Sequence, residues 1–270
     1  MKVGPKDYDA YFADNARAWN LRTPHHVESG FYDVEKWKAG GATITPLESS
    51  WLGDIRGKSL LHLQCHFGQD TLSIARLGAE VTGVDLSSES VAAAQRLARE
   101  VAIDARFVEG NVFDVRLDRR FDIVFTSWGV IGWLPRLEPW AETIAAHLAP
   151  GGRFLLFEFH PYVWMSQTGP DLSIRYSYFN RGVITETTKG TYADREAPIE
   201  YDEHGWNHSL SDVFTALLGA GLQITRFEEL DHVFHPCFDI TEPRPGGGYW
   251  FSEAKGMVPM SYALEAKKTA

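Results

Sequence analysis

The stretch SLLHLQCHFG at residues 59–68, followed by EVTGVD at residues 80–85, predicts the fold of this chain. The apolar runs are typical of two buried strands of a parallel sheet, with a tight turn and a short helix between them. The second strand ends in a lone carboxylate, Asp85. In open α/β sheets a ligand binds beyond the carboxyl ends of the strands, where such a turn leads into a helix. The two segments therefore predict a site for a nucleotide-like cofactor.

The turn contains one glycine, Gly68, where a dinucleotide site has three. A pyrophosphate needs close approach of the backbone, and the side chains of His66 and Phe67 would obstruct it. S-adenosylmethionine carries only a carboxylate at the corresponding end, for which one glycine and a free helix N-terminus near residues 68–71 are sufficient. The turn thus favours S-adenosylmethionine over a nicotinamide cofactor.

The rest of the chain alternates between strand-like and helix-like segments, which indicates a doubly wound α/β fold with helices on both faces of the sheet. We expect a mostly parallel seven-stranded sheet whose last strand is antiparallel. The expected strands are residues 59–64, 80–85, 105–109, 121–127, 153–159, 222–229 and 258–267. The expected helices are residues 70–77, 87–101, 138–148 and 209–220.

Two segments lie outside this pattern. Residues 1–56 combine a helical period at 8–19 with a polar and aromatic stretch at 19–32, and we interpret them as a lid, with a packed structural extension as the alternative. Residues 160–205 show no helical period and are predicted to form a substrate cap, with strands at 173–178 and 183–192 joined by a turn at 180–182. Residues 57–159 and 206–270 are then the cofactor-binding core.

Composition excludes several classes of function. The formal net charge of −10 and the lack of a basic cluster disfavour a partner that is a nucleic acid. No apolar run reaches the roughly 18 residues that span a bilayer, and the first residues lack the apolar centre of a secretory signal, so no membrane partner and a cytoplasmic location are expected. Two cysteines are too few for a disulfide framework and indicate reduced thiols.

Four motifs in order resemble those of the class I S-adenosylmethionine-dependent methyltransferases. The first motif of that family is an acidic residue, an apolar residue and Gly-Cys-Gly-x-Gly, and this chain has HLQCHFG at residues 62–68. Leu63, Cys65 and Gly68 match, whereas His62 replaces the acid. The second motif ends at Asp85, the third resembles GNVFD at 110–114, and the fourth is FDIVFTSW at 121–128. The resemblance covers residues 57–159 and, more loosely, 209–267.

The resemblance implies the cofactor S-adenosyl-L-methionine, with S-adenosyl-L-homocysteine as product. Asp85 would accept hydrogen bonds from the ribose hydroxyls, since it follows Gly68 at close to the separation of about 20 residues at which a carboxylate meets the ribose. The alternative reading of Asp85 is a helix-capping residue. Asn111 and Val112 would contact the adenine. The predicted cofactor-binding residues are Gln64, Cys65, His66, Gly68, Asp85, Leu86, Asn111, Val112, Phe113 and Ser127.

Nine tryptophans and an aromatic share of 13% are high, and rings outside the regular core can line a substrate pocket, although core packing is their more common use. The predicted pocket residues are Trp19, His25, His26, Trp128, Trp133, Tyr162, Trp164, Trp206 and His208. His160 immediately follows strand five and is the candidate general base, with hydrogen bonding to the backbone as the structural alternative. His232, His235 and Cys237 fall short of a zinc pattern, so no metal is expected.

These features predict a methyltransferase that acts on an oxygen or nitrogen of a small molecule by in-line displacement in a closed, aromatic-lined pocket. The protein is expected to be a monomer or a homodimer. A non-catalytic protein that binds S-adenosylmethionine is one alternative. A nicotinamide-dependent oxidoreductase is the other, because it shares the strand, turn, helix and acid pattern.

Overall fold

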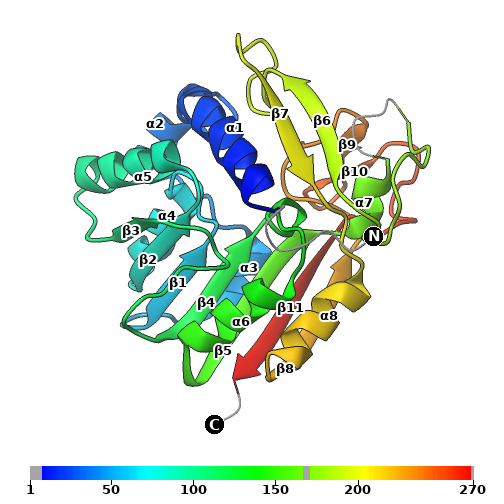
Figure 1. Cartoon of the computed structure of the whole chain (residues 1–270). Coiled ribbons are helices and arrows are strands. Elements are labelled where there is room, and N and C mark those ends of the chain that lie inside the picture. Colours follow the sequence, from blue (N-terminus) through cyan, green and yellow to red (C-terminus); the bar gives the residue numbers. More distant parts are fainter. Residues whose placement is uncertain (1–7, 167–170, 269–270) are drawn as a thin grey trace.

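The computed structural model describes residues 8–166 and 171–268, and its centre is one seven-stranded sheet with the order β3-β2-β1-β4-β5-β11-β8 (Figure 1). Strand β11 runs antiparallel to both of its neighbours, and the four pairings among β3, β2, β1, β4 and β5 are parallel. The predicted sheet is confirmed. Its strands are β1 (Ser59–Leu63), β2 (Glu80–Asp85), β3 (Arg106–Glu109), β4 (Phe121–Ser127), β5 (Leu148–Phe159), β8 (Leu222–Leu230) and β11 (Ser261–Lys268).

Helices cover both faces of this sheet, as the alternating sequence pattern predicted. On one face lie α6 (Glu138–His147) and α8 (Leu210–Gly219); on the other lie α3 (Pro46–Leu52), α4 (Gln69–Arg76) and α5 (Ser88–Glu100). Strand β1 shows why: Leu61 and Leu63 pack with α6 and α8, whereas Leu60 packs with α3. Since alternate side chains of a strand point to opposite faces, a continuous apolar run is the pattern of a strand buried on both sides.

The N-terminal segment forms one long helix, α1 (Tyr8–Glu28), and a short one, α2 (Val34–Lys38). The helix continues about two turns beyond the end expected from the sequence, although Pro24 lies inside it. Its outer face docks on α5: Asn20 Oδ1 accepts a hydrogen bond from Ser87 Oγ at 2.6 Å, and the Thr23 and Ser90 hydroxyls lie 2.7 Å apart. The free energy of this packing offsets the loss of the helical hydrogen bond that Pro24, which has no N–H, cannot donate.

The segment after β5 corrects the sequence prediction. Strand β6 (Ile184–Lys189) falls within the expected strand 183–192, but it pairs with β7 (Glu200–Gly205), and no strand forms at residues 173–178. The short helix α7 (Pro161–Met165) was also not predicted. Strand β7 is held against α1 because the Asn15 side chain bonds to the backbone of His204 in both directions, at 2.9 Å each. The hairpin therefore depends on contacts with a helix distant in sequence.

A second small sheet follows β8, where the sequence indicated an irregular segment. It pairs β9 (Thr241–Pro243) with β10 (Tyr249–Phe251). In Figure 1 it lies beside the β6–β7 hairpin, beyond the carboxyl ends of the parallel strands. Within residues 8–166 and 171–268, no helix is both long and apolar enough to cross a membrane.

Candidate active site

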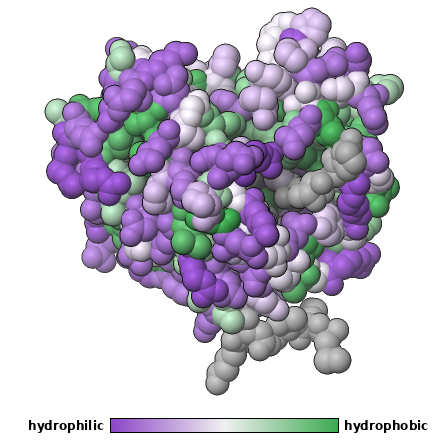
Figure 2. All heavy atoms as spheres, turned by 90° about the horizontal axis from the view of Figure 1, so that it is seen from above, coloured by the Kyte–Doolittle hydropathy of each residue, from purple (hydrophilic) through white to green (hydrophobic). Residues whose placement is uncertain are grey.

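A cavity of about 1130 Å³ lies beyond the carboxyl ends of β1, β2 and β4. Its walls come from α1, from the β6–β7 hairpin and from the segment between β8 and β11, and its floor from the turns that follow the three strands. Seen from above, hydrophilic residues cover much of this face of the molecule, with smaller hydrophobic areas between them (Figure 2). The cavity lies where open α/β sheets bind their ligands.

The turn after β1 has an unusual backbone. Gln64, His66 and Gly68 all have positive φ, at 57°, 51° and 77°. A Cβ atom on Gly68 would lie 2.6 Å from the Phe107 ring and 2.8 Å from the Ala94 Cβ, so only glycine fits at the start of α4. The turn thereby brings backbone atoms to the cavity wall immediately before a helix N-terminus.

His62 stands where the family usually has an acid, and it supports this turn in another way. Its ring is buried, and Nδ1 lies 2.8 Å from the Thr71 hydroxyl in the first turn of α4. Burial lowers the pKa of His62 to about 3, so the ring is neutral. A neutral imidazole bonded to a hydroxyl thus ties β1 to α4 without a charge.

Asp85 lies at the end of β2 beside this turn. Its Oδ2 accepts a hydrogen bond from the His66 N–H at 2.7 Å, and its Oδ1 accepts one from the Ser87 N–H at 2.9 Å. Burial raises the pKa of Asp85 to about 6, although these backbone donors oppose the shift. Each carboxylate oxygen can accept a further hydrogen bond, so the group can bind a ligand hydroxyl pair.

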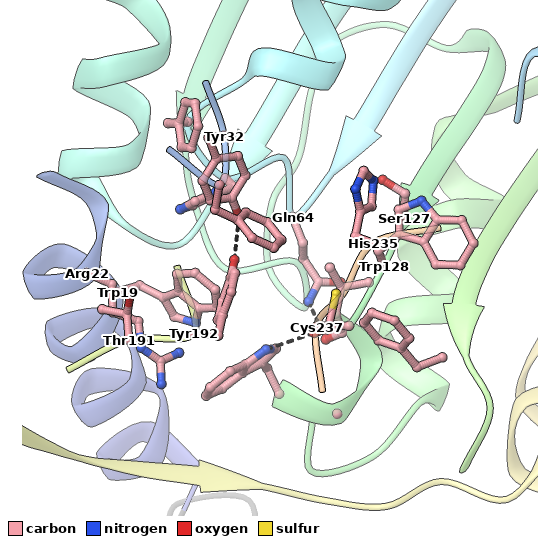
Figure 3. Close-up of a pocket in the computed structure, with 18 of the residues that line it drawn as sticks. Trp19, Arg22, Tyr32, Gln64, Ser127, Trp128, Thr191, Tyr192, His235 and Cys237 are labelled. Atoms are coloured by element: carbon pink, nitrogen blue, oxygen red, sulfur yellow. Dashed lines mark hydrogen bonds between the residues drawn. The ribbon is translucent and has the colours of Figure 1, made fainter. Parts of the chain in front are cut away.

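The loop after β4 is held by Glu158 of β5. This carboxylate is fully buried and accepts hydrogen bonds from the N–H groups of Gly129, Val130 and Ile131 at 2.5, 2.8 and 3.1 Å. The loop carries Ser127 and Trp128 into the cavity wall, and Figure 3 shows both on the side opposite Trp19 and Arg22. Glu158 was not singled out from the sequence, because a lone acid in an apolar strand has no distinguishing motif.

The structure places the predicted cofactor residues together. All of them except Phe113 line the cavity. Phe113 instead packs edge-on against Phe12, with ring centroids 5.2 Å apart. The predicted substrate residues divide into two groups. Those that line the cavity are Trp19, Trp128, Trp133, Trp164 and Trp206.

The predicted substrate residues that do not line the cavity are His25, His26, Tyr162 and His208. His25 lies near Asp194 at 3.9 Å, and His208 Nε2 lies 2.7 Å from the Leu134 carbonyl oxygen. His26 is buried behind the cavity wall with Nδ1 3.2 Å from His66 Nε2. These histidines connect structural elements of the wall.

The general-base hypothesis for His160 is not supported by its position. His160 is buried and absent from the cavity lining. Its Nδ1 accepts a hydrogen bond from the Tyr162 N–H at 3.1 Å, which caps α7, and its Nε2 lies 3.0 Å from Glu229. Both ring nitrogens thus face protein groups, so we give the residue a structural role.

Arg22 was one of the residues that favoured a lid, but sequence reasoning missed its polar partners where α1 meets β7. Arg22 Nε donates to the Tyr201 hydroxyl at 2.6 Å, and Arg22 Nη2 pairs with Glu203. All three residues line the cavity. The available signal was the spacing of Asn15, Trp19 and Arg22, which places them on one face of a helix. Tyr32 and Tyr192 bond through their hydroxyls nearby, joining the segment after α1 to the one after β6 (Figure 3).

His232, His235 and Cys237, which were considered for a metal, do not share one site. His232 Nδ1 lies 2.8 Å from Asp231, whereas His235 and Cys237 line the cavity. Among the described residues, no group of three or more His, Cys, Asp or Glu side chains could hold a metal ion.

Glu48 gives a prediction for stability. It is buried, accepts a hydrogen bond from Trp128 Nε1 at 2.9 Å, and completes a capping box with Thr45. Burial raises the pKa of Glu48 to about 8, with a further contribution from Asp70. Its contribution to the free energy of unfolding therefore falls as the pH rises above about 4.5 and is lost once the pH passes 8.

We expect Glu48→Gln to be less sensitive to alkaline pH than the wild type, because glutamine keeps the cap but carries no charge. Thermal unfolding at pH 5.5 and 8.5 measures this, and Glu35→Gln, at an exposed site, is the matched control. Equal pH sensitivity of wild type and Glu48→Gln would contradict the assignment.

Comparison with known proteins shows what this chain resembles in sequence and in fold. Residues 61–154 match the family model described as a methyltransferase domain. The fold is shared with a putative S-adenosylmethionine-dependent methyltransferase from Listeria monocytogenes (TM-score 0.59, 19% identity, 82% of this chain and 96% of that one). It is shared also with the DhpI–SAH complex (TM-score 0.57, 18% identity, 97% of this chain and 98% of that one). The resemblance to the class I S-adenosylmethionine-dependent methyltransferases is thus confirmed.

The curated proteins that are similar in sequence are also named methyltransferases. A cypemycin N-terminal methyltransferase from Streptomyces sp is 27% identical over 54% of this chain and 62% of its own length. A ubiquinone biosynthesis O-methyltransferase from Aeromonas salmonicida is 26% identical over 48% and 57%. The chain therefore spans about three-fifths of the length of these curated relatives. The match to a methyltransferase domain is that of residues 61–154.

Proposed function

We propose that this protein binds S-adenosylmethionine and transfers its methyl group to an oxygen or nitrogen of a small molecule. One observation carries the proposal: Asp85 and the turn at residues 64–68 are hydrogen-bonded to each other and line the same cavity of about 1130 Å³. Single-ligand pockets occupy roughly 300–1,000 Å³. The cavity is therefore large enough for the cofactor and an acceptor together.

The residues at the floor of the cavity fit the cofactor. Asp85 would accept from the ribose hydroxyls, and Asn111 and Val112, which line the cavity, would contact the adenine. The Oε1 atom of Gln64 is buried without a hydrogen-bond partner among the described residues, while Nε2 donates to the Val130 carbonyl at 2.8 Å. An unpaired buried acceptor suits the ammonium group of the methionine part, and the N-terminus of α4 suits its carboxylate.

The chain's contribution to the reaction would be alignment and exclusion of water. When bound, the cofactor supplies an electrophilic methyl carbon, and a neutral thioether remains after the lone pair of the acceptor has taken that methyl. Trp19 and Trp133 lie edge to face at 5.3 Å in the cavity wall, where their rings would help to exclude water. Orientation in a closed site can lower such a barrier by about 7–11 kcal/mol. An acceptor that binds as a free amine or a phenolate attacks through its lone pair without a base, and a methylated amine gives up its extra proton to bulk water after release.

The same proposal gives roles to the parts of the chain. Residues 57–159 and 206–270 would bind the cofactor, residues 1–56 would close over it, and residues 160–205 would cap the acceptor. A cytoplasmic monomer or homodimer is part of this proposal. Both cysteines are free thiols, which suits a reducing compartment.

The test is methyl transfer from S-adenosylmethionine with a labelled methyl group to a metabolite extract. We expect S-adenosylhomocysteine to form and the label to appear in small molecules. Binding of the cofactor without its consumption across the extract and a metabolite panel would favour the non-catalytic alternative. Binding of a nicotinamide cofactor in its place would favour an oxidoreductase, and label found only in protein or RNA would contradict the substrate class.

A further inference from the structure

A buried arginine faces the cavity from the lid side. Arg22 is 5% exposed and projects from α1 beside Trp19 and close to Thr191 (Figure 3). The faces of Trp19, Trp133 and Tyr201 surround its guanidinium, with Cζ 4.8, 5.2 and 4.5 Å from the ring centroids. Desolvation lowers and Glu203 raises the pKa of Arg22, with a net rise, so the group stays charged.

The hydrogen bonds leave one edge of this guanidinium open. Nε donates to the Tyr201 hydroxyl and Nη2 to Glu203 Oε2. The other oxygen of Glu203 accepts from the Thr188 hydroxyl at 2.7 Å. Nη1 has no hydrogen-bond partner among residues 8–166 and 171–268, and it is not one of the atoms sealed from solvent. A guanidinium with a free edge in a cavity is suited to a carboxylate.

The other cationic side chains of the cavity wall are less suited to this role. Lys36 is exposed, and the side chains of Lys189 and Arg195 are 80% and 59% exposed. An exposed cation is screened by water and contributes little to affinity, whereas a buried one contributes more. Arg22 is therefore the cation that would select a ligand.

Arg22 is held by the hairpin wall of the cavity and not by the turns of its floor. Both polar partners of Arg22 come from β7, outside the sheet whose turns form the cofactor floor. The opposite wall is aromatic: Trp128 and Phe159 have ring centroids 5.9 Å apart, and Phe238 lies 5.4 Å from Phe159. Such a wall stacks with a planar or apolar body.

We propose that the acceptor is an aromatic or apolar carboxylic acid, whose carboxylate binds Arg22 and whose body packs toward the wall of Trp128 and Phe159. The carboxylate is recognised and is not the group that is methylated. The inference rests on the proposed methyl transfer and adds the class of acceptor. Arg22 is then the residue that determines specificity, held in position by Tyr201 and Glu203.

The first experiment measures binding to the full chain saturated with S-adenosylhomocysteine. Three acids are compared by calorimetry with their uncharged amides: phenylacetate, indole-3-acetate and 4-hydroxybenzoate. We expect at least one acid to bind about 10- to 100-fold more tightly than its amide, the range for a hydrogen bond to a charged group. Equal affinity within every pair, or binding by none of the acids, would overturn the inference.

The second experiment uses the double variant Arg22→Gln with Glu203→Gln, because Arg22→Gln alone leaves Glu203 buried without its partner. We expect the double variant to keep its affinity for S-adenosylhomocysteine and to lose the preference for acids. Arg17→Gln removes an arginine of the same helix whose side chain is 66% exposed, and it should retain the preference.

The outcomes separate the two proposals. Failure of the wild type to bind S-adenosylhomocysteine would refute the proposed function itself. A double variant that keeps the preference for acids would refute the role of Arg22 alone. Loss of cofactor affinity in the double variant would instead assign Arg22 to cofactor binding. An equal loss of acid and amide binding would show that Arg22 only holds α1 against β7. Both results would contradict the inference.

Discussion

Asp85→Ala is expected to weaken the binding of S-adenosylmethionine about 100-fold or more. The Asp85 carboxylate lies at the cavity wall and can accept two hydrogen bonds from a ribose, each contributing about 1.5–3 kcal/mol. The variant also loses the bonds from the His66 and Ser87 N–H groups, which shape the turn. Both losses act on the same part of the cofactor site. Calorimetric titration of wild type and variant measures the effect.

The matched control is Asp122→Asn. Asp122 has similar bonds, accepting from both the backbone N–H and the hydroxyl of Ser59 at 2.9 Å, but it lies at the opposite end of β4. We expect Asp122→Asn to change stability and to leave cofactor affinity unchanged. Equal cofactor affinity in Asp85→Ala and the wild type would sink the ribose assignment.

The pH dependence of cofactor binding is a second, independent test of the role of Asp85. Burial raises the pKa of Asp85 to about 6, so its carboxylate becomes protonated in the free protein as the pH falls below that value. The protonated form accepts hydrogen bonds less well. Affinity for S-adenosylmethionine should therefore fall by about tenfold in total between pH 7 and pH 5 in the wild type, and remain flat in Asp85→Ala. A flat wild-type profile would contradict this role.

Glu158→Ala is expected to cost about 4 kcal/mol of stability and to lower the melting temperature by about 10 °C. Glu158 is fully buried, and its removal leaves the N–H groups of Gly129, Val130 and Ile131 without an acceptor. The loop that carries Trp128 should then lose its fixed conformation. We expect methyl transfer to decline even at temperatures where the variant is folded.

Two substitutions make this result interpretable. Glu158→Gln keeps one oxygen acceptor and should lose about half as much stability, whereas Glu80→Ala removes a side chain that is 71% exposed and should change it by less than about 0.5 kcal/mol. Denaturant unfolding of the three variants gives the values. A loss of less than about 1 kcal/mol in Glu158→Ala would show that the loop does not depend on this carboxylate.

The sheet and the residues at the floor of the cavity could be predicted from the sequence because both depend on local pattern. An apolar run that ends in Asp85 indicates a buried strand and its carboxyl end, and Gly68 marks the turn. The pairing of β6 could not be predicted in this way, since its partner β7 is selected by contacts with Asn15 and Arg22 of a helix far away in the sequence.

Side-chain direction explains the remaining differences. His160 lies at the end of β5 as the pattern indicated, yet its ring faces the backbone of α7 and Glu229. Arg22 falls in the polar and aromatic stretch that was interpreted as part of a lid, and the continuation of α1 to Glu28 places it on the cavity face. Neither orientation is determined by residues near it in the chain.

The most direct test of the central claim is a crystal structure of the protein with S-adenosylhomocysteine. We predict that both ribose hydroxyls lie within hydrogen-bond distance of the Asp85 carboxylate, with the adenine beside Asn111 and the methionine part at Gln64. A ligand bound elsewhere, or a ribose that does not contact Asp85, would contradict the account.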